Sequence, residues 1–308
     1  MTFIATEVVN GVATLAVNRP QSGNALNLSV FAQLTAALDE LVAQAEVHAI
    51  VLTGEGNKFC SGADLGAFVR YLEARDFDRI VEVVRTSQMA FEKIASCPKP
   101  IVAAVGGAAV GGGVELALAC HRVVATPPAS FSFPETSLGI LPFSGGTYRV
   151  PRRVGPALCK WIVYAGPMLP PPKALAMGFV DELAMPADLM TAAQATARSL
   201  AASPESCEWL PKEPPNELAA MASLFSAATV EELLAADVSA DRALAKAQAA
   251  AASRPPATLQ WGDKLIDEAG AQTTQQGAEA ALAAVPELFR DPAVYEAMTR
   301  IAQQQRQS

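Results

Sequence analysis

Residues 105–120 read VGGAAVGGGVELALAC and place five glycines ahead of a single carboxylate, Glu115. The apolar segment PIVAAVGG (100–107) predicts a buried strand and VELALAC (114–120) predicts a helix, so the glycines mark the junction between them. Glycines at a helix N-terminus let a ligand approach bare N–H groups, which favour an oxygen that develops negative charge, or a phosphate. Taken alone, such a cluster more often indicates close packing of a helix on a strand.

The chain alternates strands and helices on both sides of this junction. The predicted strands are 3–9 and 12–17, joined by a hairpin turn at Asn10-Gly11, then 48–54, 100–107, 122–126 and 130–135, and the predicted helices lie within 30–42, 68–96 and 114–120. This alternation predicts an α/β fold with parallel crossovers. After about residue 155 the strand signals fade into alanine-rich helical pattern, in which Thr229 and Glu232 predict a capping box.

Composition and charge exclude several classes of function. The 308 residues are 51% hydrophobic and carry a net charge of −8 with no basic patch, which disfavours nucleic-acid binding. No N-terminal signal pattern and no run of about eighteen apolar residues occurs, so we expect a cytoplasmic protein without a membrane anchor. Five dispersed cysteines and two histidines, without CxxC or HxxxH, predict free thiols and no metal site. The glycine spacing matches neither GxGxxG nor a Walker loop.

Two further segments favour an active site over simple packing. KFCSGADL (58–65) follows a predicted strand with another turn of small residues, which offers a second backbone N–H. FPETSLGILPFSGGT (133–147) places Glu135 in apolar surroundings, where a carboxyl group is expected to have a raised pKa suited to proton transfer. Glu115 and Glu135 together suggest paired acid–base chemistry. Cys60 has no histidine segment nearby to activate it and is expected to be a packed thiol.

Several segments, in order, resemble the signature blocks of the enoyl-CoA hydratase/isomerase (crotonase) superfamily. They are NRPQSGNALN (18–27), KFCSGADL, PKPIVAAVGGAAVGGGVELALACHRVVAT, FSFPETSLGILPFSGGTYRVPRRVG and ALAMGFVDEL, and they span about residues 3–205. The resemblance implies a spiral of repeated ββα units over 1–205 and a helical C-terminal region over 206–308. It also implies an acyl-CoA thioester substrate, no cofactor beyond the coenzyme A of that substrate, and a homotrimer or dimer of trimers.

The resemblance also implies the roles of individual residues. The N–H groups of Ala63 and Gly112 would form an oxyanion hole for the thioester oxygen, and Asp64, Leu65 and Phe143 would line the substrate site. Glu115 would activate water and Glu135 would exchange the proton beside the carbonyl. Retention of both glutamates resembles the hydratases, which add water to a 2-enoyl-CoA.

Two departures keep alternatives open. Phe143 stands where hydratases usually carry glycine, which puts the acyl length in doubt. An insertion at about 206–255 contains LFSAATVEELLAAD, which resembles a segment of the 3-hydroxyisobutyryl-CoA hydrolase branch. The chain lacks the aspartate which that branch has at position 143 and retains Glu115, which the branch lacks. Hydrolysis of a 3-hydroxyacyl-CoA, isomerisation of an enoyl-CoA, and acyl-CoA binding without catalysis therefore stand as alternatives to hydration.

Overall fold

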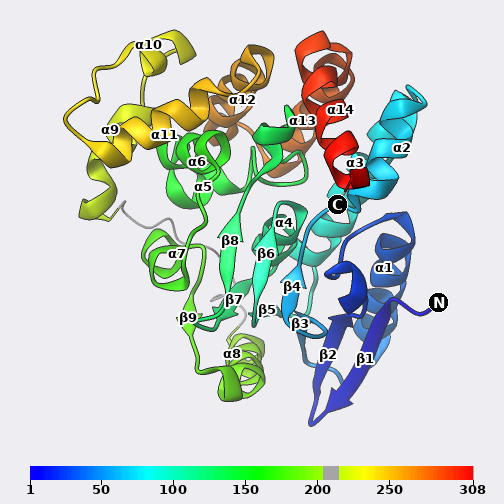
Figure 1. Cartoon of the computed structure of the whole chain (residues 1–308). Helices are drawn as coiled ribbons and strands as arrows, with labels where there is room; N and C mark the ends of the chain where they lie inside the picture. The colour runs from blue at the N-terminus through cyan, green and yellow to red at the C-terminus, as the bar shows by residue number, and fades with distance from the viewer. Residues whose placement is uncertain (204–214, 308) are drawn as a thin grey trace. The chain divides into compact units, whose positions relative to one another are not determined.

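The computed structural model describes residues 1–203 and 215–307 and divides them into two compact units (Figure 1). The first unit comprises residues 1–64, 86–131 and the described part of 168–210. The second comprises residues 65–85, 132–167 and the described part of 211–308. Each unit is built from segments far apart in the sequence. The division implied by the resemblance, a core over 1–205 and a helical region over 206–308, stays a prediction.

The first unit contains a six-stranded sheet with the strand order β1-β2-β3-β5-β7-β9. The strands are β1 (Ile4–Val9), β2 (Val12–Val17), β3 (Ala49–Gly54), β5 (Ile101–Val105), β7 (Arg122–Ala125) and β9 (Glu182–Leu183). Only β1 and β2 pair antiparallel, and each later neighbour in this sheet pairs parallel. The predicted α/β class with parallel crossovers is confirmed.

A tight turn at Asn10-Gly11 joins β1 and β2. Asn10 has φ 49° and Gly11 has φ 77°, the two positive values of a type I′ turn, whose twist matches that of the flanking strands. The register pairs Val9 with Val12 and Ile4 with Val17, so the hairpin has no slip along its length. The hairpin predicted from Asn-Gly is therefore confirmed.

One face of the sheet packs against helix α8 (Leu189–Ala202). Alternate residues of the strands, such as Val51 and Val102, are fully buried against Ala193, Ala197 and Leu200 of that helix. Helix α1 (Leu28–Ala43) packs on β1 and β2, and it begins where the side chain of Asn27 accepts a hydrogen bond from the N–H of Val30. The two helices and the sheet give the first unit its apolar core.

A second, smaller sheet has the order β4-β6-β8, and all of its residues except Ser132 belong to the first unit. Its strands are β4 (Lys58–Cys60), β6 (Ala108–Val110) and β8 (Ser130–Ser132), and helix α4 (Gly112–Ala119) follows β6 directly. The sequence pattern predicts that the strand at 100–107 leads straight into this helix, and that expectation is wrong. The structure inserts β6, whose three residues lie between the glycine pair 106–107 and the three glycines 111–113 and are too few to show a periodicity.

Helices make up most of the second unit. They are α2 (Leu65–Glu73), the first part of α3 (Phe77–Ala95), α5 (Val150–Val154), α6 (Pro156–Ala165), α9 (Ala219–Phe225), α10 (Val230–Ala235), α11 (Arg242–Ala252), α12 (Pro256–Glu268), α13 (Thr274–Arg290) and α14 (Pro292–Gln307), with short 3-10 turns, among them η2 (Glu135–Leu138) and η6 (Ala269–Ala271). The helix α7 (Pro171–Met177) belongs to the first unit. None of the described helices is both long and apolar enough to cross a lipid bilayer.

An ion-pair cluster around the buried Lys160 joins α6 to α12. The ammonium group of Lys160, whose side chain is 5% exposed, lies 3.0 Å from Asp263 Oδ1 and 2.8 Å from Asp267 Oδ2. The hydroxyl of Tyr164 donates to Asp263 at 2.8 Å. Because the lysine has two carboxylate partners, its charge is compensated at a position where an isolated charge would be costly.

The cap predicted at Thr229 is confirmed in part. The Thr229 hydroxyl accepts from the N–H of Glu232 at 3.2 Å, as a capping box requires. The Glu232 carboxylate accepts from the N–H of Ala228 at 3.0 Å instead of from Thr229 itself. The helix start is thus as predicted, while the reciprocal bond is displaced by one residue.

Replacement of Gly11 by alanine is expected to lower the free energy of unfolding by about 1–2 kcal/mol, because a non-glycine residue at positive φ is strained. A Cβ there would also lie 2.8 Å from Cδ2 of His48. Urea unfolding of Gly11→Ala measures the change, and Gly270→Ala is the control, since no atom lies within 4 Å of a Cβ at Gly270. Equal stability of both variants would contradict the role of the turn.

Candidate active site

The turn after β4 lies against the start of α4, and two glycines allow that approach. Gly62 has φ +85°, and a Cβ on it would lie 2.6 Å from the carbonyl oxygen of Val110. A Cβ on Gly113 would lie 2.2 Å from the carbonyl oxygen of Cys60. Both distances are shorter than any real carbon–oxygen contact, so the two backbones meet only because these residues lack side chains.

Gly112 lies beside these contacts but is not needed for them. A Cβ on Gly112 would be 3.6 Å from the Cα of Gly62, 3.7 Å from the backbone nitrogen of Ala63 and 3.8 Å from Oε2 of Glu115, all ordinary contact distances. There is consequently room for about one more atom beside Gly112. The structure brings together three of the residues predicted to act, namely Ala63, Gly112 and Glu115.

Two backbone N–H groups border this space. The N–H of Leu26 donates to the carbonyl of Gly62 at 2.8 Å, and the N–H of Asp64 donates to the carbonyl of Leu26 at 2.8 Å. These two hydrogen bonds form a parallel bridge between Leu26 and Ala63. In a parallel bridge the N–H of the residue between the two bonded groups, here Ala63, points away from the paired residue Leu26. Gly112 opens α4, where the first N–H groups of a helix have no acceptor within the helix. The arrangement can therefore stabilise an oxygen that gains negative charge.

Glu115 lies in the first turn of α4 and is 4% exposed. The helix N-terminus carries partial positive charge, which attracts an acidic side chain in the first turn. A buried carboxylate whose oxygen lies 3.8 Å from the Cβ position of Gly112 is placed to accept a proton from a molecule held at that spot.

Glu135 and Phe143 belong to the second unit. Glu135 begins η2, is half-buried, and its Oε2 atom is inaccessible to solvent. The hydroxyl of Thr136 donates to the carbonyl of Val163 at 2.7 Å and ties η2 to α6. Phe143 is 4% exposed in a fully buried loop, residues 141–148. Their assignment to the site, like that of the half-buried Leu65 at the start of α2, stays a prediction.

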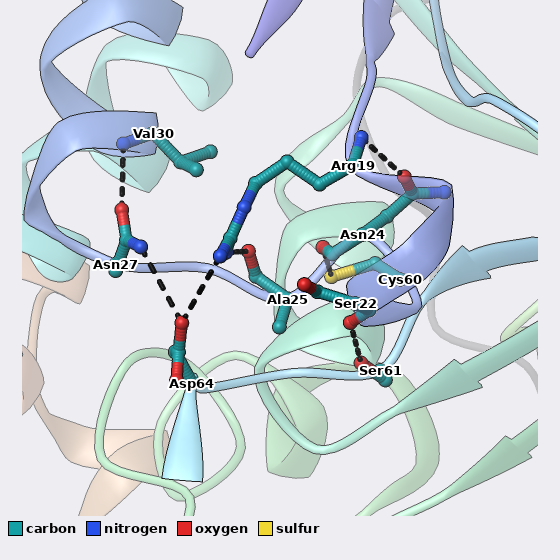
Figure 2. Close-up of polar contacts among 9 residues, drawn as sticks. All are labelled: Arg19, Ser22, Asn24, Ala25, Asn27, Val30, Cys60, Ser61 and Asp64. Carbon is teal, nitrogen blue, oxygen red and sulfur yellow. Dashed lines mark hydrogen bonds and ion pairs between the residues drawn. The ribbon is translucent and has the colours of Figure 1, made fainter. Parts of the chain in front are cut away.

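Asp64 holds the turn to the segment before α1 (Figure 2). Its Oδ2 atom accepts from Nη2 of Arg19 at 3.2 Å and from Nδ2 of Asn27 at 3.4 Å. The sequence pattern alone indicates no role for Arg19 or Asn27, although both lie in the block NRPQSGNALN. Because 45 residues separate Arg19 from Asp64 in the sequence, no local spacing reveals the pair.

Cys60 and the two histidines have structural positions. The Cys60 thiol is fully buried and donates to the carbonyl of Asn24 at 3.2 Å, and burial raises its pKa to about 12 despite a hydrogen bond from the N–H of Gly62. The Nδ1 atom of His121 accepts from the N–H of Ile101 at 2.9 Å, and burial lowers its pKa. His48 is exposed beside the hairpin turn. A buried thiol with so high a pKa is a poor nucleophile at neutral pH.

Comparison with known proteins places this geometry in a family context. Residues 7–246 match the family described as enoyl-CoA hydratase/isomerase. The chain is 37% identical over 191 residues to the crotonyl-CoA hydratase of Syntrophomonas wolfei. The aligned region covers 61% of this chain and 71% of that protein. It is 34% identical over 192 residues to the short-chain-enoyl-CoA hydratase of Clostridium acetobutylicum, with 61% and 71% covered.

A solved structure of similar fold is an enoyl-CoA hydratase from Rhodobacter sphaeroides. Its TM-score is 0.83 and its sequence identity is 22%, over 99% of this chain and 91% of that one. At this identity the likeness concerns the fold.

The four described cysteines are expected to resist a disulfide dye in the folded protein, because all of them are buried and burial raises the pKa of Cys60, Cys97 and Cys159. Cys207 lies outside the described residues, so the measurement uses Cys207→Ser. Four thiols should react after unfolding in guanidinium and none quickly before it. Fast labelling of Cys60 in the folded state would contradict its placement.

Proposed function

The chain belongs to the enoyl-CoA hydratase/isomerase family, and we propose that it catalyses the reversible addition of water to a 2-enoyl-CoA thioester. The observation that carries this proposal is the space beside Gly112, bordered by the Ala63 nitrogen and by Oε2 of Glu115. Two N–H donors and one carboxylate at a single spot suit a carbonyl oxygen together with a proton acceptor. Hydratases among the relatives support the same reaction class.

In the proposed reaction the N–H groups of Ala63 and Gly112 bind the thioester oxygen. Attack of water at C3 moves electrons toward that oxygen, and the enolate so formed carries the negative charge there. Fixed donors stabilise the enolate more than the neutral carbonyl, so they lower the barrier. Because the donors belong to the backbone, small residues at these positions matter more than particular side chains.

The two glutamates are proposed to divide the proton transfers. Glu115 accepts a proton from water as the C3–O bond forms, and Glu135 donates a proton to C2 as the enolate collapses. Exchange with solvent then restores both glutamates, so the net change is the gain of one H2O. The same steps in reverse eliminate water. No metal or redox cofactor takes part, and coenzyme A enters as part of the substrate.

Assembly and location belong to the same proposal. The resemblance implies a homotrimer or a dimer of trimers, and we propose separately that the protein is cytoplasmic. Light scattering of the purified chain measures the assembly directly.

Glu115→Gln and Glu135→Gln are each expected to lower kcat for hydration of crotonyl-CoA by about 100- to 10,000-fold, the range for loss of a general acid or base. The decrease in enoyl-thioester absorbance measures the rate, and a disulfide dye measures release of free coenzyme A. An unchanged rate in either variant would refute the role given to that glutamate. Release of coenzyme A without hydration would favour hydrolysis of the thioester. Binding of the acyl-CoA without any turnover would favour a non-catalytic subunit.

Gly112→Ala is expected to fold normally and to lose at least about 100-fold in hydration rate, because its methyl group would keep the thioester oxygen from its N–H donors, and loss of one oxyanion donor costs this much. Its methyl group would lie at ordinary contact distance from the Ala63 nitrogen and Glu115 Oε2, in the place proposed for the substrate oxygen. Gly113→Ala is the matched control, because its Cβ would overlap the Cys60 carbonyl and should reduce stability instead. Full activity in folded Gly112→Ala would contradict the proposed oxyanion site.

A further inference from the structure

The direction of the Ala63 N–H depends on one peptide plane. The carbonyl of Gly62 and the N–H of Ala63 belong to the same trans peptide and point in opposite directions. Since the N–H of Leu26 donates to the Gly62 carbonyl at 2.8 Å, this hydrogen bond also fixes where the Ala63 N–H points. Gly62 has no side chain, so it adds little resistance of its own to rotation about the Cα–C bond that would turn this plane. The orientation must therefore come from the segment that carries Leu26.

An ion pair holds that segment against the turn (Figure 2). Nη1 of Arg19 donates to the carbonyl of Ala25 at 2.5 Å, and Nη2 of the same side chain donates to Asp64 Oδ2 at 3.2 Å. Asn27 donates to the same carboxylate oxygen at 3.4 Å. Arg19 thus bridges the residue before Leu26 and the residue after Ala63.

Further bonds fix the start of the same segment. The N–H of Arg19 donates to Oδ1 of Asn24 at 2.9 Å, and Nδ2 of Asn24 donates to the carbonyls of Glu55 and Lys58 at 2.9 and 2.8 Å. Asn24 is fully buried. Arg19 is also largely enclosed, since its side chain is 15% exposed and that of Asp64 is 27% exposed. The surrounding residues therefore fix the orientation of the guanidinium group, which has little contact with solvent.

We propose that the Arg19–Asp64 ion pair is a positioning device for catalysis, which keeps the Gly62–Ala63 peptide turned so that the Ala63 N–H faces the space beside Gly112. This inference rests on the proposed function, in which that N–H binds the thioester oxygen. Asp64, which the resemblance assigns to substrate binding, acts here through the backbone. Arg19 and Asp64 are positioning residues and touch no reacting atom.

The test compares Asp64→Ala, Arg19→Met and the double variant with the wild type. Loss of the pair is expected to lower kcat by about 100-fold, the effect of misplacing a catalytic group by about 1 Å, while KM changes by less than about threefold. The double variant should lose no more than Asp64→Ala alone, because both substitutions remove one interaction. Arg19→Lys, which keeps the charge but cannot reach two acceptors as a fork, should recover only part of the rate.

A spectroscopic readout separates positioning from general stability. The probe is an arylacryloyl-CoA ester, whose absorption band moves to longer wavelength when its thioester carbonyl accepts strong hydrogen bonds. The wild type at saturating probe should show the shift, and Asp64→Ala should bind the probe with most of the shift lost. Asp39→Ala is the matched control, because it breaks the Lys93–Asp39 pair of the same unit and should leave both the shift and kcat unchanged.

The outcomes distinguish this inference from the proposed function. A shift and a kcat in Asp64→Ala equal to those of the wild type would overturn the positioning role and leave the oxyanion site intact. No shift in the wild type itself would overturn both. If Asp64→Ala has a reduced folded fraction by circular dichroism, Asp64→Asn replaces it. This variant keeps the volume and one acceptor oxygen, so kcat is expected to fall, but by less than the roughly 100-fold loss expected for Asp64→Ala.

Discussion

The close approach of two stretches of backbone, the turn after β4 and the N-terminus of α4, is the constraint on which the rest of the site depends. Gly113 and Gly62 allow it, since a side chain on either would overlap a carbonyl oxygen. The approach leaves Gly112 as the place where one additional atom fits between an amide nitrogen and a carboxylate oxygen. The three consecutive glycines at 111–113 therefore do different work: Gly113 closes a backbone contact, whereas Gly112 keeps a space open.

Charge and orientation follow from that contact. The first N–H groups of α4 have no acceptor within the helix and carry partial positive charge, which suits both an incoming oxygen and the buried carboxylate of Glu115 in the first turn. The turn after β4 supplies a second N–H, whose direction is set by the bridge between Leu26 and Ala63. That bridge is held from the side by Arg19 and Asp64. The direction of this backbone N–H therefore depends on the polar side chains that hold its peptide in place.

The sequence was sufficient to predict the elements whose signals are local. The Asn10-Gly11 hairpin, the strands β1, β2, β3, β5 and β7 of the large sheet and the helix after the glycines are as expected, because turn chemistry and hydrophobic periodicity act over a few residues. The two-residue strand β9 was not predicted. β6 was missed because three residues cannot show a period. Arg19 was missed because its partner lies 45 residues away. The sequence also cannot distinguish Gly112 from Gly113, since only the distances to Ala63, Glu115 and Cys60 separate an open position from a packed one.

The central claim is that the N–H groups of Ala63 and Gly112 together bind the carbonyl oxygen of an acyl-CoA thioester. A crystal structure with an unreactive saturated acyl-CoA tests it most directly. The account predicts the thioester oxygen at about 2.7–3.1 Å from both backbone nitrogens, with C3 of the acyl chain within reach of a water held by Glu115. An acyl-CoA whose thioester oxygen lies away from Gly112, or a phosphate group of the coenzyme seated at the start of α4 in its place, would contradict it.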